Sequence, residues 1–352
     1  MAEPAGRRME AVRRHLLPPS APPPPVLSPN PLSSLAVTVV EPSPVIIGGM
    51  VLDIHAKPSV PPHPGTTVPG MVKYISGGVA RNIAECMSKL GTRPFMISVV
   101  GNDMAGDFLL KYWRSAGLCT EVAYESGVPV LFEPVSVVKS RRIEPIAEYI
   151  TCTSPNEIEL VAMANALSPS VKYNFHKMEQ CKDKAEAVEY LFEMLSPAMF
   201  FLLENGIKLL IVTLGSNGVF ICCKEHTNFM KDQRKCKQTP FSTQLLEKLE
   251  GSFLSNTPVN LCGERSSRTC VFHLPAISAS VISLTGAGDC LVGGVLSGLC
   301  GGLDIIRSVA VGVAIAKASV ESEANIPDNI CAASVADDAK RILLSAKKLW
   351  CR

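Results

Sequence analysis

The chain has 352 residues, of which 47% are hydrophobic, and it carries a formal net charge of +2 at pH 7. This length and composition allow one large or two modest domains with a substantial core, and the small charge gives no indication of a nucleic-acid partner. The 6 histidines and 13 cysteines show no metal-binding spacing, which argues against a structural metal site.

Residues 1–44 are rich in proline and arginine, and we expect them to form a disordered leader outside the folded domain. Within the leader, Arg8-Met9 and His15-Leu16 resemble the N-terminal peroxisomal import signal. In a helix, Met9 and Leu16 share one face that a receptor groove can bind. We therefore expect a peroxisomal location, with mitochondrial, plastid and cytoplasmic locations as alternatives.

Two glycine turns follow. A buried strand from Val45 runs into a glycine turn with Asp53 just beyond it. Ligands gather at the carboxyl ends of parallel strands, so Asp53 is placed to accept hydrogen bonds from sugar hydroxyls, although a turn-capping aspartate is the alternative. The second turn, Gly77-Gly78, opens a helix with an apolar stripe, and Asn82 lies one turn into it, within reach of a ligand over the glycines.

The middle of the chain has two patterns suited to binding phosphate. Asn156 and Glu159 share a face of a helical turn, where an amide and a carboxylate can hold magnesium-bound waters and phosphate oxygens. An ordinary helix N-terminus is the alternative. A strand that ends near Thr213 leads into Gly215 and Gly218, which let the backbone approach a nucleotide. The alternative there is a simple strand-turn-strand.

The stretch Thr285–Asp289 is the centre of the functional hypothesis. Its glycines allow a sharp turn, and an apolar run behind it predicts a buried helix, so unpaired N–H groups form an anion site. We expect Asp289 to act as a general base while Gly286, Ala287 and Gly288 hold the charge that develops on a transferring phosphoryl group. The alternative is a first-turn aspartate favoured by the helix dipole, worth about 0.3–1 kcal/mol.

The apolar span that follows, residues 290–320, is interrupted by glycine pairs and charged side chains. It therefore predicts two packed helices and no membrane segment.

Taken in order, these motifs resemble those of the ribokinase-like (PfkB) sugar kinases, over residues 45 to about 330. The resemblance implies one kinase domain, 45–345, folded as a three-layer α/β/α sandwich with a mainly parallel sheet. It also implies a nucleoside or sugar substrate, with ATP and Mg²⁺ as cofactors and a monovalent cation as a further candidate. One departure is Ser283, where the family usually has an acid.

The resemblance also assigns roles to the candidate residues. Asp289 is the catalytic base, with Gly286, Ala287 and Gly288 as the anion hole. The remaining positions bind ligands: the substrate at Asp53, Gly77, Gly78 and Asn82, the nucleotide at Asn156, Thr213, Gly215 and Gly218, and the metal ion at Glu159.

Within this family, residues 48–54, 69–72, 77–84 and 132–139 resemble the plant-type pseudouridine kinases. The implied reaction moves the γ-phosphoryl group of ATP to the 5′-hydroxyl of pseudouridine. A kinase for ribose, adenosine or fructose would keep the same motifs and stays open. A non-catalytic nucleoside-binding protein is the second alternative.

Two intervals depart from the family pattern. The helix that ends near residue 117 is followed closely by a strand at 129–135, although parallel crossovers require helices and strands to alternate. In the family this interval carries a core strand, a helix and the returning strands of a small β-lid. We therefore expect a truncated lid and impaired activity. The polar, basic stretch 224–268 is expected to be a loop insertion.

Overall fold

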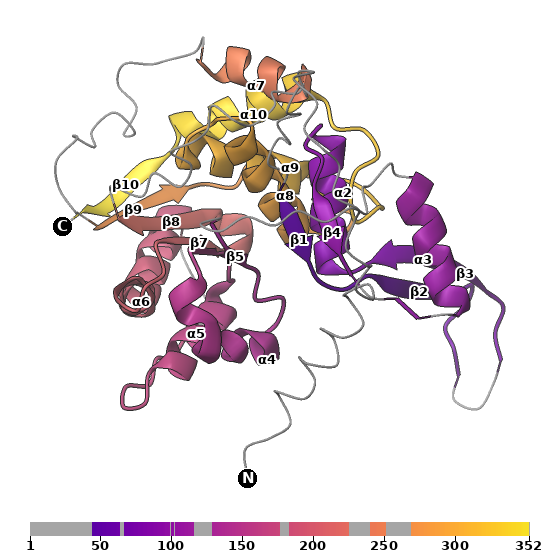
Figure 1. The fold of residues 1–352 in the computed structure, drawn as a ribbon, viewed down its shortest axis with the longest axis horizontal. Helices are drawn as coiled ribbons and strands as arrows, with labels where there is room; N and C mark the ends of the chain where they lie inside the picture. Colours follow the sequence, from indigo (N-terminus) through magenta and orange to yellow (C-terminus); the bar gives the residue numbers. More distant parts are fainter. Residues whose placement is uncertain are drawn as a thin grey trace, which may run out of the picture. The chain divides into compact units, whose positions relative to one another are not determined.

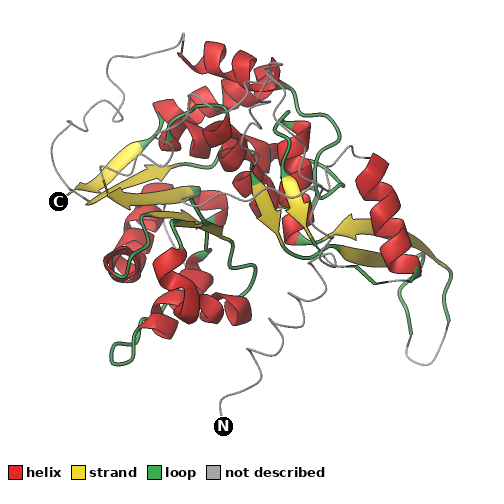
Figure 2. Cartoon of the chain, in the orientation of Figure 1, coloured by secondary structure: helices red, strands yellow, loops and turns green. Residues whose placement is uncertain are grey.

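The computed structural model describes residues 44–63, 67–98, 100–101, 103–115, 129–176, 183–224, 240–250 and 269–351. The expected leader and its peroxisomal signal lie outside the described residues. Glu41–Arg352 form one structural unit, in which helices and strands are interspersed along the chain (Figure 1, Figure 2). None of the described helices has the length and apolar character that crossing a membrane requires.

A six-stranded sheet with the strand order β10-β9-β8-β7-β6-β5 forms the centre of this unit (Figure 1). Pairing is parallel from β5 to β7 and antiparallel from β7 to β10. The parallel part is as predicted, and the reversal occurs because a tight glycine turn connects β7 directly to β8. The strands are β5 (Leu131–Phe132), β6 (Cys152–Thr153), β7 (Leu209–Thr213), β8 (Val219–Lys224), β9 (Thr269–Leu274) and β10 (Lys347–Cys351).

Helices cover both faces of the sheet. Successive residues of a strand point to opposite faces, and in this sheet the residues on both faces are apolar. Along β7, Leu209 and Ile211 belong to one hydrophobic core, whereas Leu210 and Val212 belong to the other. A strand buried on both faces requires helices on both sides, which gives the predicted three-layer sandwich.

The helices divide between these two cores. The first core contains α2 (Val79–Lys89), α8 (Ala287–Cys300), α9 (Ile305–Val320) and α10 (Ala332–Leu344). The second contains the 3₁₀ helix η1 (Arg141–Tyr149), α5 (Glu157–Leu167) and α6 (Lys184–Glu204), and the short α4 (Val137–Ser140) precedes η1. Helix α3 (Met104–Ser115) lies beside the N-terminal strands (Figure 1).

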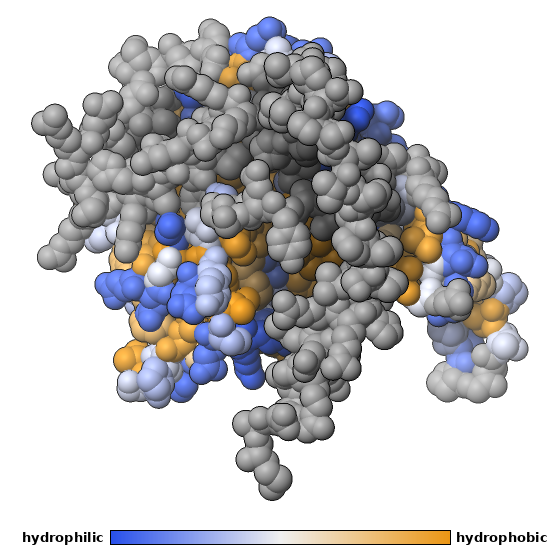
Figure 3. All heavy atoms as spheres, viewed as in Figure 1, coloured by the Kyte–Doolittle hydropathy of each residue, from blue (hydrophilic) through white to orange (hydrophobic). Residues whose placement is uncertain are grey.

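The N-terminal region adds two small sheets. Strand β1 (Val45–Ile47) pairs in parallel with β4 (Phe95–Ile97), and β2 (Val51–Pro58) forms an antiparallel hairpin with β3 (Gly70–Gly77). Within the described residues, neither β1 nor β4 pairs with the central sheet, and Ile47 is 73% exposed. Apolar atoms are also exposed around the hairpin and α3, at the right of Figure 3. This hairpin is the described part of the chain to which the expected lid refers, and the truncation itself stays a prediction.

The prediction of a loop at 224–268 is wrong for part of that stretch, because residues 240–250 form helix α7 (Pro240–Glu250). Phe241, Leu245 and Leu249 repeat every four residues, and this face packs into the first core, against α10. Charged residues around the helix hid this short apolar stripe. Residues 225–239 and 251–268 lie outside the described residues.

Helices α8 and α9 pack through facing glycines, and they are the two helices predicted from the apolar run. A Cβ atom on Gly294 would lie 2.8 Å from the Cα of Gly312, and one on Gly312 would lie 2.6 Å from the Leu291 carbonyl oxygen. Neither position has room for a side chain, so α9 holds α8 in place by direct backbone contact.

We expect Gly312→Ala to lower the free energy of unfolding by about 1–3 kcal/mol, because the added methyl group overpacks this contact. Alanine is otherwise the better helix former by about 1 kcal/mol. Urea unfolding measures the change. Gly288→Ala is the matched control, since nothing lies within 4 Å of its Cβ position, and it should not be destabilised. A Gly312→Ala variant as stable as the wild type would contradict this packing argument.

Candidate active site

Helix α8 begins at a turn in which the N–H of Ala287, one of the predicted anion-hole residues, donates to the Leu284 carbonyl at 3.5 Å. The N-cap residue, Gly286, has a φ of 87°, and any side chain there would collide with the carbonyl oxygen of Asn325. The first helical hydrogen bond runs from the Cys290 N–H to the Gly286 carbonyl at 2.8 Å. The N–H groups of Gly288 and Asp289 precede that bond, so this helix end offers donors and partial positive charge to an anion.

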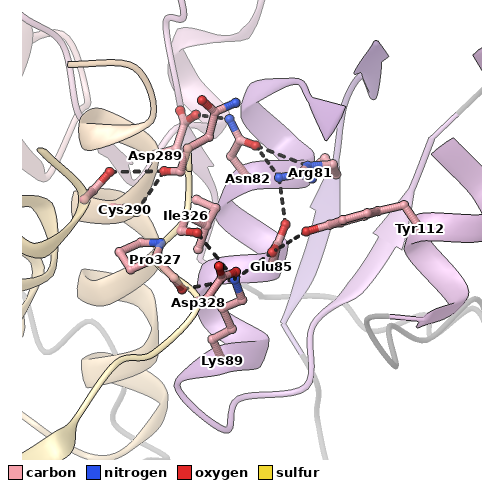
Figure 4. Close-up of polar contacts among 12 residues, drawn as sticks. Arg81, Asn82, Glu85, Lys89, Tyr112, Asp289, Cys290, Ile326, Pro327 and Asp328 are labelled. Atoms are coloured by element: carbon pink, nitrogen blue, oxygen red, sulfur yellow. Dashed lines mark hydrogen bonds and ion pairs between the residues drawn. The ribbon is translucent and has the colours of Figure 1, made fainter. Parts of the chain in front are cut away.

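Asp289 meets Asn82 across helices α8 and α2. The Asn82 Nδ2 donates a hydrogen bond of 2.6 Å to Oδ2 of Asp289 (Figure 4). Burial raises the pKa of Asp289 to about 6, whereas the Asn82 hydrogen bond and the positive charge of Arg81 act to lower it. A carboxylate with a pKa close to neutrality can accept a proton and release it again, as a general base must.

The predicted substrate-binding residues lie together at the start of α2. Asp53 sits on β2 opposite Ile75 of β3. Its carboxylate lies against Gly77, where any side chain would collide with it. Gly78, with a φ of 101°, is the N-cap residue of α2, and Asn82 follows one turn later. The structure therefore brings Asp53 and the glycine turn to the helix end that carries Asn82.

Asn156 and Glu159 form a capping box at the start of α5. The Asn156 Oδ1 accepts hydrogen bonds from the N–H groups of Ile158 and Glu159 at 3.0 and 2.9 Å, and the Glu159 carboxylate accepts one from the Asn156 N–H at 3.0 Å. The alternative of an ordinary helix N-terminus is thus present. The capping box uses only one carboxylate oxygen of Glu159, Oε2. A parallel bridge joins Asn156 to Thr213 at the end of β7.

The glycine loop after β7 completes this second group. Gly215 and Gly218 have φ values of 55° and 96°, and the Leu214 N–H donates to the Gly218 carbonyl at 2.9 Å. Nothing lies within 4 Å of the Cβ position of Gly215, so this side of the turn is open to a ligand. His273 of β9 makes a 2.6 Å hydrogen bond to the Asn217 carbonyl and fixes the loop from behind.

Glu133 is a further candidate site residue, which the sequence motifs did not single out. Its Oε2 is buried and has no hydrogen-bond partner among the described residues. Burial and the negative charges of Glu159 and Asp289 raise the pKa of Glu133 well above its usual range. Glu133 is therefore coupled electrostatically to one carboxylate of each group. The available signal was its position just after a short apolar strand, the same signal that singled out Asp53.

The turn after Glu133 provides a hydrogen-bond donor to this carboxylate. Val135 has a φ of 64°, which is unusual for a β-branched residue, and its N–H donates to the Glu133 carboxylate. Backbone strain of this kind is common at ligand sites.

No group of three or more His, Cys, Asp or Glu side chains in the described part of the chain forms a metal site by itself. Mg²⁺ is commonly held by one or two carboxylates together with waters and substrate phosphates. The unpartnered oxygen of Glu133 and the second oxygen of Glu159 fit such an ion chemically.

Comparison with known proteins identifies the family. The model of the pfkB family carbohydrate kinases matches residues 44–128 and 250–330. A pseudouridine kinase from Arabidopsis thaliana is 38% identical over 375 aligned positions, which cover 87% of this chain and 98% of that protein. The chain belongs to the pfkB family of carbohydrate kinases.

The chain is also similar to ribokinases in sequence and in fold. A ribokinase from Lactococcus lactis is 25% identical over 290 positions, covering 78% of this chain and 90% of that enzyme. The structure of Arabidopsis thaliana ribokinase with ribose and ATP superposes with a TM-score of 0.53 at 17% identity, over 86% of this chain and 99% of that one. The ribokinase-like fold predicted from the sequence is thereby confirmed.

Glu133 should make the stability of this kinase depend on pH. Its folded-state pKa lies above the unfolded-state value, so the folded protein loses stability as the pH rises through that interval. Glu133→Gln lacks this charge. We expect its free energy of unfolding to exceed that of the wild type at about pH 8 and to match it at about pH 4.

Urea unfolding at both pH values measures this difference. Glu144→Gln, at an exposed position of η1, is the control and should change stability by less than about 0.5 kcal/mol at either pH. A Glu133→Gln variant that is less stable than the wild type at the higher pH would show that burial does not disfavour the charged form of Glu133, which contradicts this prediction.

Proposed function

We propose that this pfkB family kinase transfers the γ-phosphoryl group of ATP to the 5′-hydroxyl of pseudouridine. The observation that carries the proposal is the contact between Asn82 and Asp289 over the open N-terminus of α8. The choice of nucleoside is supported by the 38% identity to the plant pseudouridine kinase over most of the chain.

The chemistry follows from the arrangement around Asp289. Its carboxylate takes the proton of the acceptor hydroxyl, the hydroxyl oxygen bonds to the γ-phosphorus, and the bond from that phosphorus to the β-phosphate bridging oxygen breaks to release ADP. The N–H groups of Gly288 and Asp289 stabilise the charge on the phosphoryl oxygens during transfer. A positioned general base contributes about 10²- to 10⁴-fold to such a reaction.

The nucleoside occupies the region between the hairpin and α2. Asp53 accepts hydrogen bonds from ribose hydroxyls, and the glycine turn at Gly77 and Gly78 lets the sugar approach the backbone. Glu133 offers a further acceptor whose buried oxygen lacks a partner in the described residues. A donor from the ligand would satisfy that oxygen and offset the cost of its burial.

The nucleotide occupies the region of the capping box and the glycine loop. The turn at Gly215 and Gly218 lets backbone approach the nucleotide, and Asn156 lies beside it through its bridge to Thr213. Mg²⁺ would be held by Glu159 and by phosphate oxygens, with Glu133 close by. When bound, the ion neutralises charge on the phosphates.

We also infer that this chain lacks a stretch that the plant enzyme has. The alignment between them spans 375 positions, more than the 352 residues of this whole chain, although it covers only 87% of it. In the described residues, β1 and β4 are not joined to the central sheet, and the lid is a single hairpin. A short lid excludes water from the transfer less well, so we expect slow turnover.

A substrate panel with mass-spectrometric detection of phosphorylated product tests the function. With magnesium-ATP, we expect pseudouridine to have a kcat/KM at least about tenfold above those of ribose, adenosine and fructose, because a polar nucleoside site rejects analogues that leave its groups unpaired. A higher value for one of the other substrates would contradict the choice of nucleoside.

A chimera that carries the additional residues of the plant enzyme between α3 and β5 tests whether a missing stretch slows turnover, separately from the choice of substrate. Faster turnover by the chimera supports the missing stretch, whereas equal turnover contradicts it. If calorimetry detects pseudouridine binding but neither protein forms product, the chain is a nucleoside-binding protein and not a kinase.

A further inference from the structure

Arg81 makes contacts that the proposed mechanism has not yet used. It lies on α2 next to Asn82, and only 2% of its surface is exposed. Its Nε and Nη2 both donate to Oδ1 of Asn82, at 3.1 and 2.7 Å. The same amide donates from Nδ2 to Asp289 at 2.6 Å. Asn82 is thus held between a guanidinium and a carboxylate (Figure 4).

This arrangement allows the Asn82 amide only one orientation. A guanidinium only donates hydrogen bonds, and an ionised carboxylate only accepts them. A flipped amide would turn its NH₂ group toward the Arg81 donors and its oxygen toward Asp289, which loses every one of these hydrogen bonds. Arg81 therefore determines that the NH₂ group of the amide, and not its oxygen, faces Asp289.

The guanidinium itself is held firmly. Arg81 forms an ion pair of 2.7 Å with Glu85, and both side chains are only 3% exposed. The guanidinium carbon lies 5.1 Å from the ring centre of Tyr112, whose hydroxyl donates to Glu85 at 2.8 Å. A buried ion pair with these additional partners is costly to disrupt, so the plane of the guanidinium is fixed.

The same row of charges reaches the loop that packs on α8. Lys89 pairs with Glu85 at 2.9 Å and donates to the Pro327 carbonyl at 3.0 Å. Two residues before Pro327, the carbonyl oxygen of Asn325 lies against Gly286 at the start of α8. The contacts from Asp289 through Asn82 and Arg81 therefore return to the turn that positions Asp289 (Figure 4).

We propose that Arg81 is a positioning residue for phosphoryl transfer, which holds the Asn82 amide with its NH₂ group toward Asp289. The inference rests on the proposed function, in which Asp289 is the base. Arg81 acts through Asn82 and contacts neither substrate in this account.

Arg81 also acts through its charge. Its positive charge lowers the pKa of Asp289, whereas the negative charge of Asp289 acts to raise the pKa of Glu133. Without Arg81 the pKa of Asp289 rises, so more of the base is protonated at a given pH. The acid limb of the pH profile of kcat/KM must then move to higher pH.

Two substitutions separate geometry from charge. Arg81→Met removes both, whereas Arg81→Lys keeps the charge but cannot donate in the same forked geometry. We expect kcat for pseudouridine to fall by about 10- to 100-fold in both variants, because small misplacements at the reacting centre cost rates of that size. The acid limb should move to higher pH in Arg81→Met and stay near the wild-type position in Arg81→Lys.

Asp338→Asn is the control, since it breaks another partly buried ion pair, with Lys317 at 3.1 Å, away from Asn82 and Asp289. It should alter the melting temperature but neither kcat nor the pH profile. Wild-type kcat in Arg81→Lys would overturn the proposal, and this variant decides the matter if Arg81→Met does not fold.

An infrared titration of the unliganded proteins keeps this test separate from the proposed function. The carboxyl band that Asp289→Asn removes reports the protonation of Asp289. It should titrate at higher pH in Arg81→Met than in Arg81→Lys, whichever substrate the enzyme takes. Identical titration in the two variants would overturn the electrostatic part of the proposal.

Discussion

The hydrogen bond between Asn82 and Asp289 joins two helices that come from opposite parts of the chain, and the rest of the site depends on it. Its length of 2.6 Å requires α2 and α8 to lie close together. They do so because Gly293 of α8 has no side chain, and a Cβ atom there would lie 2.8 Å from the Cβ of Cys86 on α2. Any larger residue would separate the base from the substrate-binding helix.

The charges around this contact explain why the site suits phosphoryl transfer. Burial, together with the negative charges of Glu159 and Asp289, raises the pKa of Glu133 well above its usual range. The open N–H groups of α8 and the guanidinium of Arg81 provide positive potential beside them. An anionic nucleotide with its metal ion would balance both sets of charges, which a neutral ligand would not do.

The sequence predicted those features that depend on local chemistry. Gly78 and Gly286 mark helix starts because their φ values are positive, and the paired acid and amide at Asn156 and Glu159 follow helical spacing. Glu133 escaped detection because its importance comes from distant carboxylates that only the folded chain brings near it. The hydrogen bond between Asn82 and Asp289 likewise joins residues that are 207 positions apart in the sequence. The short helix α7 was not predicted for a related reason. Its stability comes from packing on the core and not from local helix propensity.

The most direct measurement of the central claim is a single-turnover assay of Asp289→Asn with excess enzyme, pseudouridine and magnesium-ATP, in which the product phosphate is followed by mass spectrometry. If Asp289 is the base, the rate should fall by about 10²- to 10⁴-fold, while calorimetry shows that ATP still binds. A rate equal to that of the wild type would contradict the account.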